Sequence, residues 1–319
     1  MKPKLFTRVL ALSLILAISL ACSLLTSMFE PGLNLEEGET YHMRTIVEQE
    51  ISQDMGSLSE DIERTIGMEI ALEVVEIDED GNYWIDMTHD WVLYEQETPL
   101  DSVSYDSDDP PDPIPPTAMG YAALVGKGFS VLISPSGEPL ETEGLDEMVN
   151  EVIADMGLFD LAPGDMIEEI TNEMIDDMED NLIQMTVSGP EGPTGVGDTW
   201  TTSRSMTGNL IGNYAMTIDS TWTLESLGYR IATINEVSDV TPNEEEAEPI
   251  DLGGLLPVGY TLSGGSQEGT YHVQLSTGLI SQATINQDLS GEATVIGLVE
   301  ETWSISIEST TTIEMVEGD

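Results

Sequence analysis

Three histidines are the residues of this chain best suited to acid–base or metal chemistry, and each stands alone. His42, His89 and His272 fall on separate predicted strands. A Ser-His-Asp or Cys-His device needs a base beside a nucleophile, and the chain contains no G-x-S-x-G, H-E-x-x-H, Walker or G-x-G-x-x-G motif. We interpret each histidine as a surface or packed residue and expect a protein that is not an enzyme. A hydrolase using paired carboxylates stays open as an alternative, although 61 acidic residues make any given pair uninformative.

Four aspartates are close together in the segment DSDDPPDPIPP, which has five prolines in 11 residues. Proline disfavours both helix and sheet, so we predict an extended loop over residues 98–116. Carboxylate oxygens suit Ca²⁺, and a solvated acidic loop without metal is the competing interpretation. The calcium candidates are Asp106, Asp108, Asp109 and Asp112.

Another acidic stretch, Asp78 to Gly81, resembles the start of an EF-hand loop. It lacks the glutamate at loop position 12, and Asp-Gly between two alternating runs favours a β-hairpin. We therefore predict a hairpin rather than a metal site.

The only cysteine, Cys22, follows an apolar run that begins at Val9 and ends in small residues. Lys2, Lys4 and Arg8 precede the run, which is the pattern of a bacterial export signal. Its 13 residues up to Ala21 are short for a membrane span of roughly 20. We predict a signal peptide over residues 1–21.

The junction before Cys22 resembles the lipobox of bacterial lipoproteins. The resemblance implies cleavage before Cys22, a diacylglycerol on its sulfur that carries fatty acyl chains such as palmitate, and a lipid-anchored tether over residues 22–37. Ser19 stands where the lipobox usually has leucine. Ordinary cleavage after Ala21, or an uncleaved anchor through Leu25, are the alternatives. A lone exported cysteine cannot form an internal disulfide, and this favours lipidation.

The net charge of −53 is unusual, and loss of the three signal cations takes it to −56. Such a field repels nucleic acid, which is bound through clusters of Lys and Arg. We expect no nucleic-acid partner. The acidity has three alternative explanations. The protein works in concentrated salt, which screens the repulsion between its own charges; it binds divalent cations; or its exported surface has drifted toward acidic residues. Five cations remain: Arg44, Arg64, Lys127, Arg204 and Arg230.

Period-two alternation predicts a mainly β, antiparallel fold with curved sheets. In the strand predicted over Glu63–Asp78, a stripe from Ile66 to Val74 lies on one face. Apolar residues at helical spacing predict a helical insert of two amphipathic helices, over residues 145–156 and 165–180. The second helix carries a methionine stripe, Met166 to Met178. We expect another long loop over residues 241–267 and a last strand over Glu292–Ser309.

The two halves of the mature chain, residues 38–188 and 189–319, echo each other. Gly38–Tyr41 is matched by Gly197–Trp200, Leu72-Glu73 by Leu224-Glu225, and the span from Gly128 to Gly137 by Gly269 to Gly278. We interpret this order as a duplication, although turns of this kind are common in antiparallel proteins.

The same landmarks resemble a widespread family of uncharacterised bacterial lipoproteins. The resemblance implies a β-rich exported lipoprotein and supplies no catalytic residues. Its motifs are Gly38–Tyr41, Asp80–Asn82, Ala123–Phe129, Ser134–Gly137, Glu143–Asp146, Val196–Trp200 and Tyr271–Gly278.

We expect a cell-envelope lipoprotein with a binding or structural role, attached to the outer face of a membrane through lipid on Cys22. One hypothesis is a carrier, in which the Met166–Met178 stripe covers a lipid or other apolar ligand. The other is a surface module that binds a protein or glycan through the acidic loops Asp106–Asp112 and Glu244–Glu248.

Overall fold

Long stretches of alternating residues fold into strands joined mostly by short turns. The computed structural model describes residues 28–29, 31–54, 59–157, 171–172, 175, 187, 189–190, 192–208, 214–242, 258–295 and 301–318. Within these ranges, 12 strands form one antiparallel sheet, which confirms the predicted mainly β, antiparallel class.

The elements follow one another in a simple order along the chain. They are β1 (Thr40–Asp54), β2 (Ser59–Ile77), β3 (Tyr83–Glu97), β4 (Ser102–Asp106), the 3₁₀ turn η1 (Pro116–Ala118), α2 (Met119–Leu124), β5 (Gly128–Ile133), β6 (Pro139–Glu143), α3 (Leu145–Asp155), β7 (Thr199–Gly208), β8 (Tyr214–Leu227), β9 (Ile231–Pro242), β10 (Val258–Gln274), β11 (Ile280–Val295) and β12 (Glu301–Val316).

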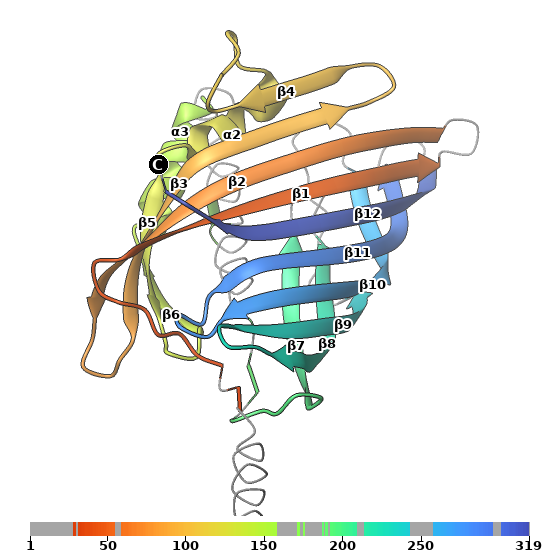
Figure 1. Ribbon diagram of the computed structural model, residues 1–319. Helices are drawn as coiled ribbons and strands as arrows, with labels where there is room; N and C mark the ends of the chain where they lie inside the picture. The colour runs from red at the N-terminus through yellow and green to blue at the C-terminus, as the bar shows by residue number, and fades with distance from the viewer. Residues whose placement is uncertain are drawn as a thin grey trace, which may run out of the picture.

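The first and last strands lie side by side in the middle of the sheet. The spatial order is β6-β5-β3-β2-β1-β12-β11-β10-β9-β8-β7, and β4 pairs with the far end of β3. Strands therefore run outward from the β1–β12 pair in both directions, the first half of the chain on one side and the second half on the other. Figure 1 shows the resulting sheet as a strongly curved surface.

The curvature brings the two wings of the sheet onto a common core. One cluster of buried side chains unites Ile85 of β3 and Val131 of β5 with Leu224, Ile234 and Val273 of the opposite wing. We call the face that bears these residues the inner face and this group the first cluster. A second cluster lies at the other end of the strands, and a third lies under α2. The second contains Ile51, Met216, Ile218, Val240, Leu262, Leu289, Ile305 and Ile307, and the third Ile66, Val92, Tyr94, Tyr105 and Ala118.

Residues near the start of the described chain are part of the first cluster. Phe29, Leu33 and Leu35, from the segment predicted as a tether, are buried in it. The backbone of Leu33 donates to Pro135, and that of Asn34 donates to Thr277. This segment therefore runs between the two wings and hydrogen-bonds to a turn of each.

The helix predicted over residues 145–156 is confirmed as α3. Leu145, Met148, Val149, Val152 and Ile153 are buried, as their spacing requires. Glycine at position 144, with φ of 78°, caps the N-terminus without a side-chain bond. The predicted helix over residues 165–180 falls almost wholly outside the described residues.

Asp78 organises the hairpin between β2 and β3, as predicted. Its Oδ1 accepts from the backbone N–H groups of Asp80 and Asn82 at 2.9 and 2.8 Å. A further bond from the side chain of Asn82 lowers the pKa of the Asp78 carboxyl. The carboxylate is occupied by the turn, so no calcium loop is needed to explain it.

Three loop and strand predictions were wrong. The segment 98–116 is not all loop, because β4 pairs with β3 ahead of the proline-rich run that begins at Pro110. The loop expected over 241–267 ends earlier, since β10 begins at Val258. A strand expected over Glu292–Ser309 is instead the end of β11 and the start of β12, which pair with each other.

The two halves share bulges at corresponding positions. Opposite β3, the extra residue of β2 is Val75, and opposite β9, the extra residue of β8 is Glu225. In β6 and β11, the extra residues are Leu140 and Ser281. The backbone N–H of Gly38 donates to Val74 and that of Gly197 to Leu224, at 2.7 and 2.8 Å. These matches support two related halves and align Leu224 with Val74 rather than with Leu72.

Candidate ligand-binding site

On β1, in the centre of the sheet, the middle of the inner face is less covered than the two ends of the strand. Along β1, Met43 and Ile51 are buried, whereas Thr45, Val47 and Gln49 between them are partly exposed. Met43 belongs to the first cluster and Ile51 to the second. A partly open band therefore separates two apolar regions of the same face.

A continuous row of polar side chains crosses the sheet along this band. Residues directly opposite each other in antiparallel strands point to the same face, so a chain of cross-strand pairs defines a line on the sheet. We call this line the polar row. From β3 to β7 it consists of Gln96, Arg64, Gln49, Ser309, Gln287, Gln267, Ser238, Ser220 and Thr202.

At the β8–β10 side of the row lies a buried glutamate whose hydrogen bonds are complete. Glu236 is 2% exposed. Ser220 and Ser238 donate to its Oε1 at 2.7 and 2.8 Å, and Gln267 and Tyr271 donate to its Oε2 at 3.0 and 2.6 Å. Burial, followed by the charge of Glu236, raises the pKa of Tyr271, so the phenol stays a donor. This network is filled and holds three strands together.

At the β2–β3 side the row contains an arginine whose hydrogen bonds are incomplete. The Nη2 of Arg64 reaches the Oε1 of Gln96 at 3.5 Å, and its buried Nε has no hydrogen-bond partner. The neighbouring Gln49 also has a buried, unpartnered Oε1. Among the described residues no carboxylate forms an ion pair with Arg64. This end of the row therefore has binding capacity that the described part of the protein does not use.

Two stacked tyrosines stand beside this arginine. The rings of Tyr94, on β3, and Tyr121, on α2, lie 4.7 Å apart at an angle of 20°. Burial raises the pKa of Tyr121 to about 12, while the positive charge of Arg64 acts in the opposite direction. The guanidinium thus lies close to an aromatic wall formed by β3 and α2.

The chemistry of this arrangement is recognition of an anion next to apolar surface. A guanidinium presents several N–H donors that fit carboxylate or phosphate oxygens. In β2, Ile62 and Ile66 flank Arg64 on the same face and join the second and third clusters. An amphipathic anion would place its charged group at Arg64 and its apolar part on either cluster.

Several residues singled out from the sequence lie outside the described residues. They are Cys22, the stripe Met166–Met178 and the acidic loop Glu244–Glu248. From that helical region Ile175 is described, and it packs against the first cluster.

The four aspartates proposed for calcium are not brought together. Asp106 accepts from the Trp91 indole at 2.9 Å and from the backbone of Asp108 at 3.0 Å. Asp108, Asp109 and Asp112 are exposed. In the described ranges they form no group with ligand atoms within 4.8 Å of one another. The solvated loop is the interpretation that this geometry favours.

The histidines have three different surroundings. His89 is buried, and its Nδ1 lies 3.2 Å from the carbonyl of Lys127. His272 lies 3.3 Å from the hydroxyl of Thr233. His42 lies on the outer face beside two carboxylates, a grouping that sequence reasoning missed.

Arg64 and Glu236 were also missed, although a sequence signal exists for both. Arg64 is in phase with the apolar stripe that runs from Ile66 to Val74, and Glu236 is in phase with Ile234 and Val240. A charged residue in phase with an apolar stripe points into the core, and this is the signal that identifies them.

Comparison with known proteins places the chain in a family. Residues 80–280, well over half of its length, match a family of unknown function, DUF6263. The chain belongs to the DUF6263 family. The matched region includes Glu236 and ends before most of β11 and all of β12; Arg64 precedes it. Membership agrees with the resemblance to an uncharacterised family, and no curated protein matches the chain.

Solved structures resemble this DUF6263 protein only distantly. A lipovitellin structure described for its lipid–protein interactions aligns with 89% of the chain at 10% identity and a TM-score of 0.46. The chain spans only 26% of that lipovitellin chain. An outer membrane channel from Pseudomonas putida F1 aligns with 90% of this chain and 100% of its own, at 8% identity and a TM-score of 0.23. Neither helix α2 nor α3, nor any other helix in the described ranges, has the length and apolar character of a membrane span.

Proposed function

We propose that this protein is an exported, non-enzymatic binding protein that holds an amphipathic anion on the inner face of its sheet. A lipid on Cys22 would keep it at the outer surface of a membrane. The ligand class is a molecule with one carboxylate or phosphate head and an apolar body. The observation that carries the proposal is the guanidinium of Arg64, which lies between two apolar clusters and forms no ion pair with any residue that the structure describes.

The charge of the chain makes this arginine unusual. With a net charge of −53, carboxylates are abundant, and Arg44 and Lys127 each pair with one or more of them. Arg64 has no such partner among the described residues, and part of its guanidinium is buried. Burying a charge without a partner is costly. A ligand anion would remove that cost, and the excess of carboxylates elsewhere would repel the same anion from the rest of the surface.

The apolar surroundings favour an amphipathic ligand over a small ion. The second cluster begins next to Arg64 at Ile62, and Val47 and Met68 are partly exposed on the same face. By contrast, a separate cavity of about 10 Å³ near Leu33 and Val273 has room for about one water molecule. We therefore expect the ligand at the polar row and not in that cavity.

Mass spectrometry of an organic extract tests the proposal. Residues 23–319 lack the signal and the lipidation site but retain every described residue, so an acyl anchor cannot be mistaken for a ligand. We expect one anionic, apolar compound per folded chain from protein purified in high salt. The variant Arg64→Gln should lose at least tenfold of it, and Arg230→Gln, the same change at an exposed arginine, should retain it.

A clean extract from folded protein, or equal occupancy in the Arg64→Gln variant, would reject this function. Turnover of glycoside or ester substrates by the same preparation would favour the hydrolase alternative instead.

A further inference from the structure

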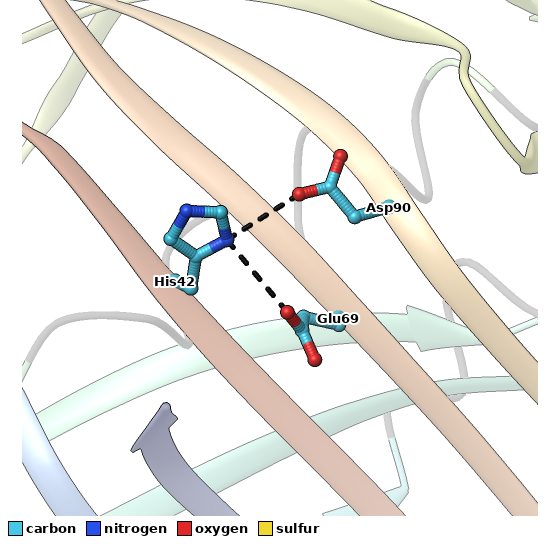
Figure 2. A group of neighbouring side chains, drawn as sticks. All are labelled: His42, Glu69 and Asp90. Atoms are coloured by element: carbon cyan, nitrogen blue, oxygen red, sulfur yellow. Dashed lines mark ion pairs between the residues drawn. The ribbon is translucent and has the colours of Figure 1, made fainter. Parts of the chain in front are cut away.

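A histidine and two carboxylates from three adjacent strands meet on the outer face of the sheet. Figure 2 shows the ring of His42, on β1, turned toward Glu69 of β2 and Asp90 of β3. The Nδ1 of His42 lies 3.3 Å from Asp90 Oδ2 and 3.7 Å from Glu69 Oε1. All three ligand atoms lie within 4.8 Å of one another, and no other such group occurs in the described ranges.

These distances are those of ligands around a metal rather than of hydrogen bonds. A hydrogen bond from a charged donor to a carboxylate is about 2.7–2.9 Å long, and the buried Nδ1 of His42 has no hydrogen-bond partner despite its two neighbours. Around a tetrahedral Zn²⁺ ion with bonds of about 2.0–2.1 Å, neighbouring ligand atoms are roughly 3.3–3.4 Å apart. The separations of His42 Nδ1 from Asp90 and from Glu69, 3.3 and 3.7 Å, are close to that spacing, and the two carboxylate oxygens lie within 4.8 Å of each other.

A β-bulge supplies one of the three ligands. Glu69 pairs with Trp91 and Ile70 with His89, so Asp90 is an extra residue of β3. The bulge lets Asp90 and Trp91 both face outward, while His89 and Val92 are buried. Bulges re-aim side chains and are frequent beside functional sites. Without this extra residue, regular alternation could not place both side chains on the outer face.

The central ligand is held in place by its neighbours. Arg44 donates from Nε and Nη2 to the Oε2 of Glu69, at 3.0 and 2.6 Å, and its guanidinium lies 4.8 Å from the centre of the Trp91 ring. The Oε1 of Glu69 is left facing His42. The other ring nitrogen of His42 lies against Gly318, where a Cβ would collide with the ring. Such outer contacts orient metal ligands in proteins.

The second half of the chain has no counterpart. The register aligns His42 with Thr201 and Glu69 with Asp219, and β9 has no bulge at the position of Asp90. The cluster is therefore a specific feature of the first half and not a by-product of the shared fold.

We propose that His42, Glu69 and Asp90 bind one Zn²⁺ ion, with the fourth position open to solvent beside the exposed Asp90. Imidazole nitrogen selects transition ions over Ca²⁺ and Mg²⁺, which prefer oxygen ligands. The site lies on the opposite face from Arg64 and is independent of the proposed function.

Zinc titration of the full chain in detergent tests this site. Protein treated with a chelator is titrated against a chromophoric competitor in excess Mg²⁺, which occupies the many surface carboxylates. We expect one tightly bound Zn²⁺ per chain, and Co²⁺ in its place should show the strong visible absorption of a four-coordinate ion. Affinity should fall about 100-fold in His42→Ala and at least tenfold in Asp90→Asn.

The control is Asp219→Asn, an equivalent change on the outer face of β8, which should bind zinc like the unmodified chain. Near-ultraviolet circular dichroism checks that each variant is folded. Weak binding of several ions instead of one, or a tight site that survives either His42→Ala or Asp90→Asn in folded protein, would overturn the assignment.

Discussion

Replacing Glu236 with alanine tests how the inner face is held together. The change removes the acceptor of four hydrogen bonds at a residue that is 2% exposed. Ser238 still donates to Ser220 at 2.8 Å and keeps an acceptor, whereas the Ser220 O–H loses the acceptor that it had in Glu236. The hydroxyl of Tyr271 and the amide of Gln267 lose theirs. At about 1–3 kcal/mol for each orphaned buried donor, we expect Glu236→Ala to lower the free energy of unfolding by about 4 kcal/mol.

Glu236→Gln separates the hydrogen bonds from the charge. Its amide oxygen can accept from Tyr271 and Gln267, and its NH₂ group can donate to the serine hydroxyls, which rotate to accept. All the buried groups then keep partners, and only the extra strength of bonds to a charged acceptor is lost. We expect a cost of about 1–2 kcal/mol.

Urea unfolding followed by tryptophan fluorescence measures both changes, because the Trp222 ring lies 5.2 Å from that of Tyr271. The m-value should stay constant, so that midpoints report stability. Glu268→Ala, on an exposed neighbour in β10, is the control and should stay within about 0.5 kcal/mol of the unmodified protein. The reasoning is refuted if Glu236→Ala costs under about 1 kcal/mol, or if Glu236→Gln costs as much as alanine, since neither result fits orphaned donors.

Two further changes test local features. Burial lowers the pKa of His89 below its usual 6.5, against opposing effects from the Lys127 carbonyl and Asp90. The unfolded chain therefore binds a proton at this residue at a higher pH than the folded chain does. The contribution of neutral His89 to the free energy of unfolding is complete above pH 6.5 and is lost as the pH falls through the lowered pKa of the folded state. Urea unfolding between pH 7 and pH 5 should therefore show a smaller loss of stability in His89→Gln, and parallel pH curves would contradict this. In Gly67→Ala, the new Cβ would lie 2.7 Å from the Trp91 ring. We expect thermal unfolding to show a free energy of unfolding lower by about 1–3 kcal/mol, together with a change in Trp91 fluorescence. A variant as stable as the parent would show that this packing is loose.

Local patterns in the sequence predict the elements well where each element carries its own signal. The stripe from Ile66 to Val74 and the turn at Asp80-Gly81 specify β2, β3 and their hairpin. Five buried residues at helical spacing specify α3. In each case, residues close in sequence decide the conformation, because they share one face or one turn.

Pairings between distant segments leave no such signal. β1 pairs with β12 along 13 residues, from His42 to Asp54. Nothing in the sequence of either strand identifies the other as its partner. β4 and β6 are five residues each, which is too short for a period-two pattern. They form strands because they hydrogen-bond to the edges of β3 and β5. The bulge at Asp90 likewise shifts the phase of β3 halfway along, so its alternation is regular only on either side of the bulge.

The two halves differ in the positions of their polar clusters. The register aligns Met87 with Glu236, Ile70 with Ser220, and Val131 with Tyr271, so these three members of the buried network have apolar counterparts in the first half. Ser238 aligns with a polar residue, His89. The reverse holds on the outer face, where the zinc ligands of the first half have no counterpart. A common fold of the two halves explains the matching bulges. It does not explain why the buried network lies on the inner face of the second half and the zinc ligands lie on the outer face of the first half. We infer that a duplicated unit supplied the sheet and that each half acquired its own polar site: a structural one that fixes β8–β10 on the inner face, and a metal-binding one that joins β1–β3 on the outer face. Arg64 lies on the inner face of the half that lacks the buried network, where apolar surroundings leave its charge available to a ligand.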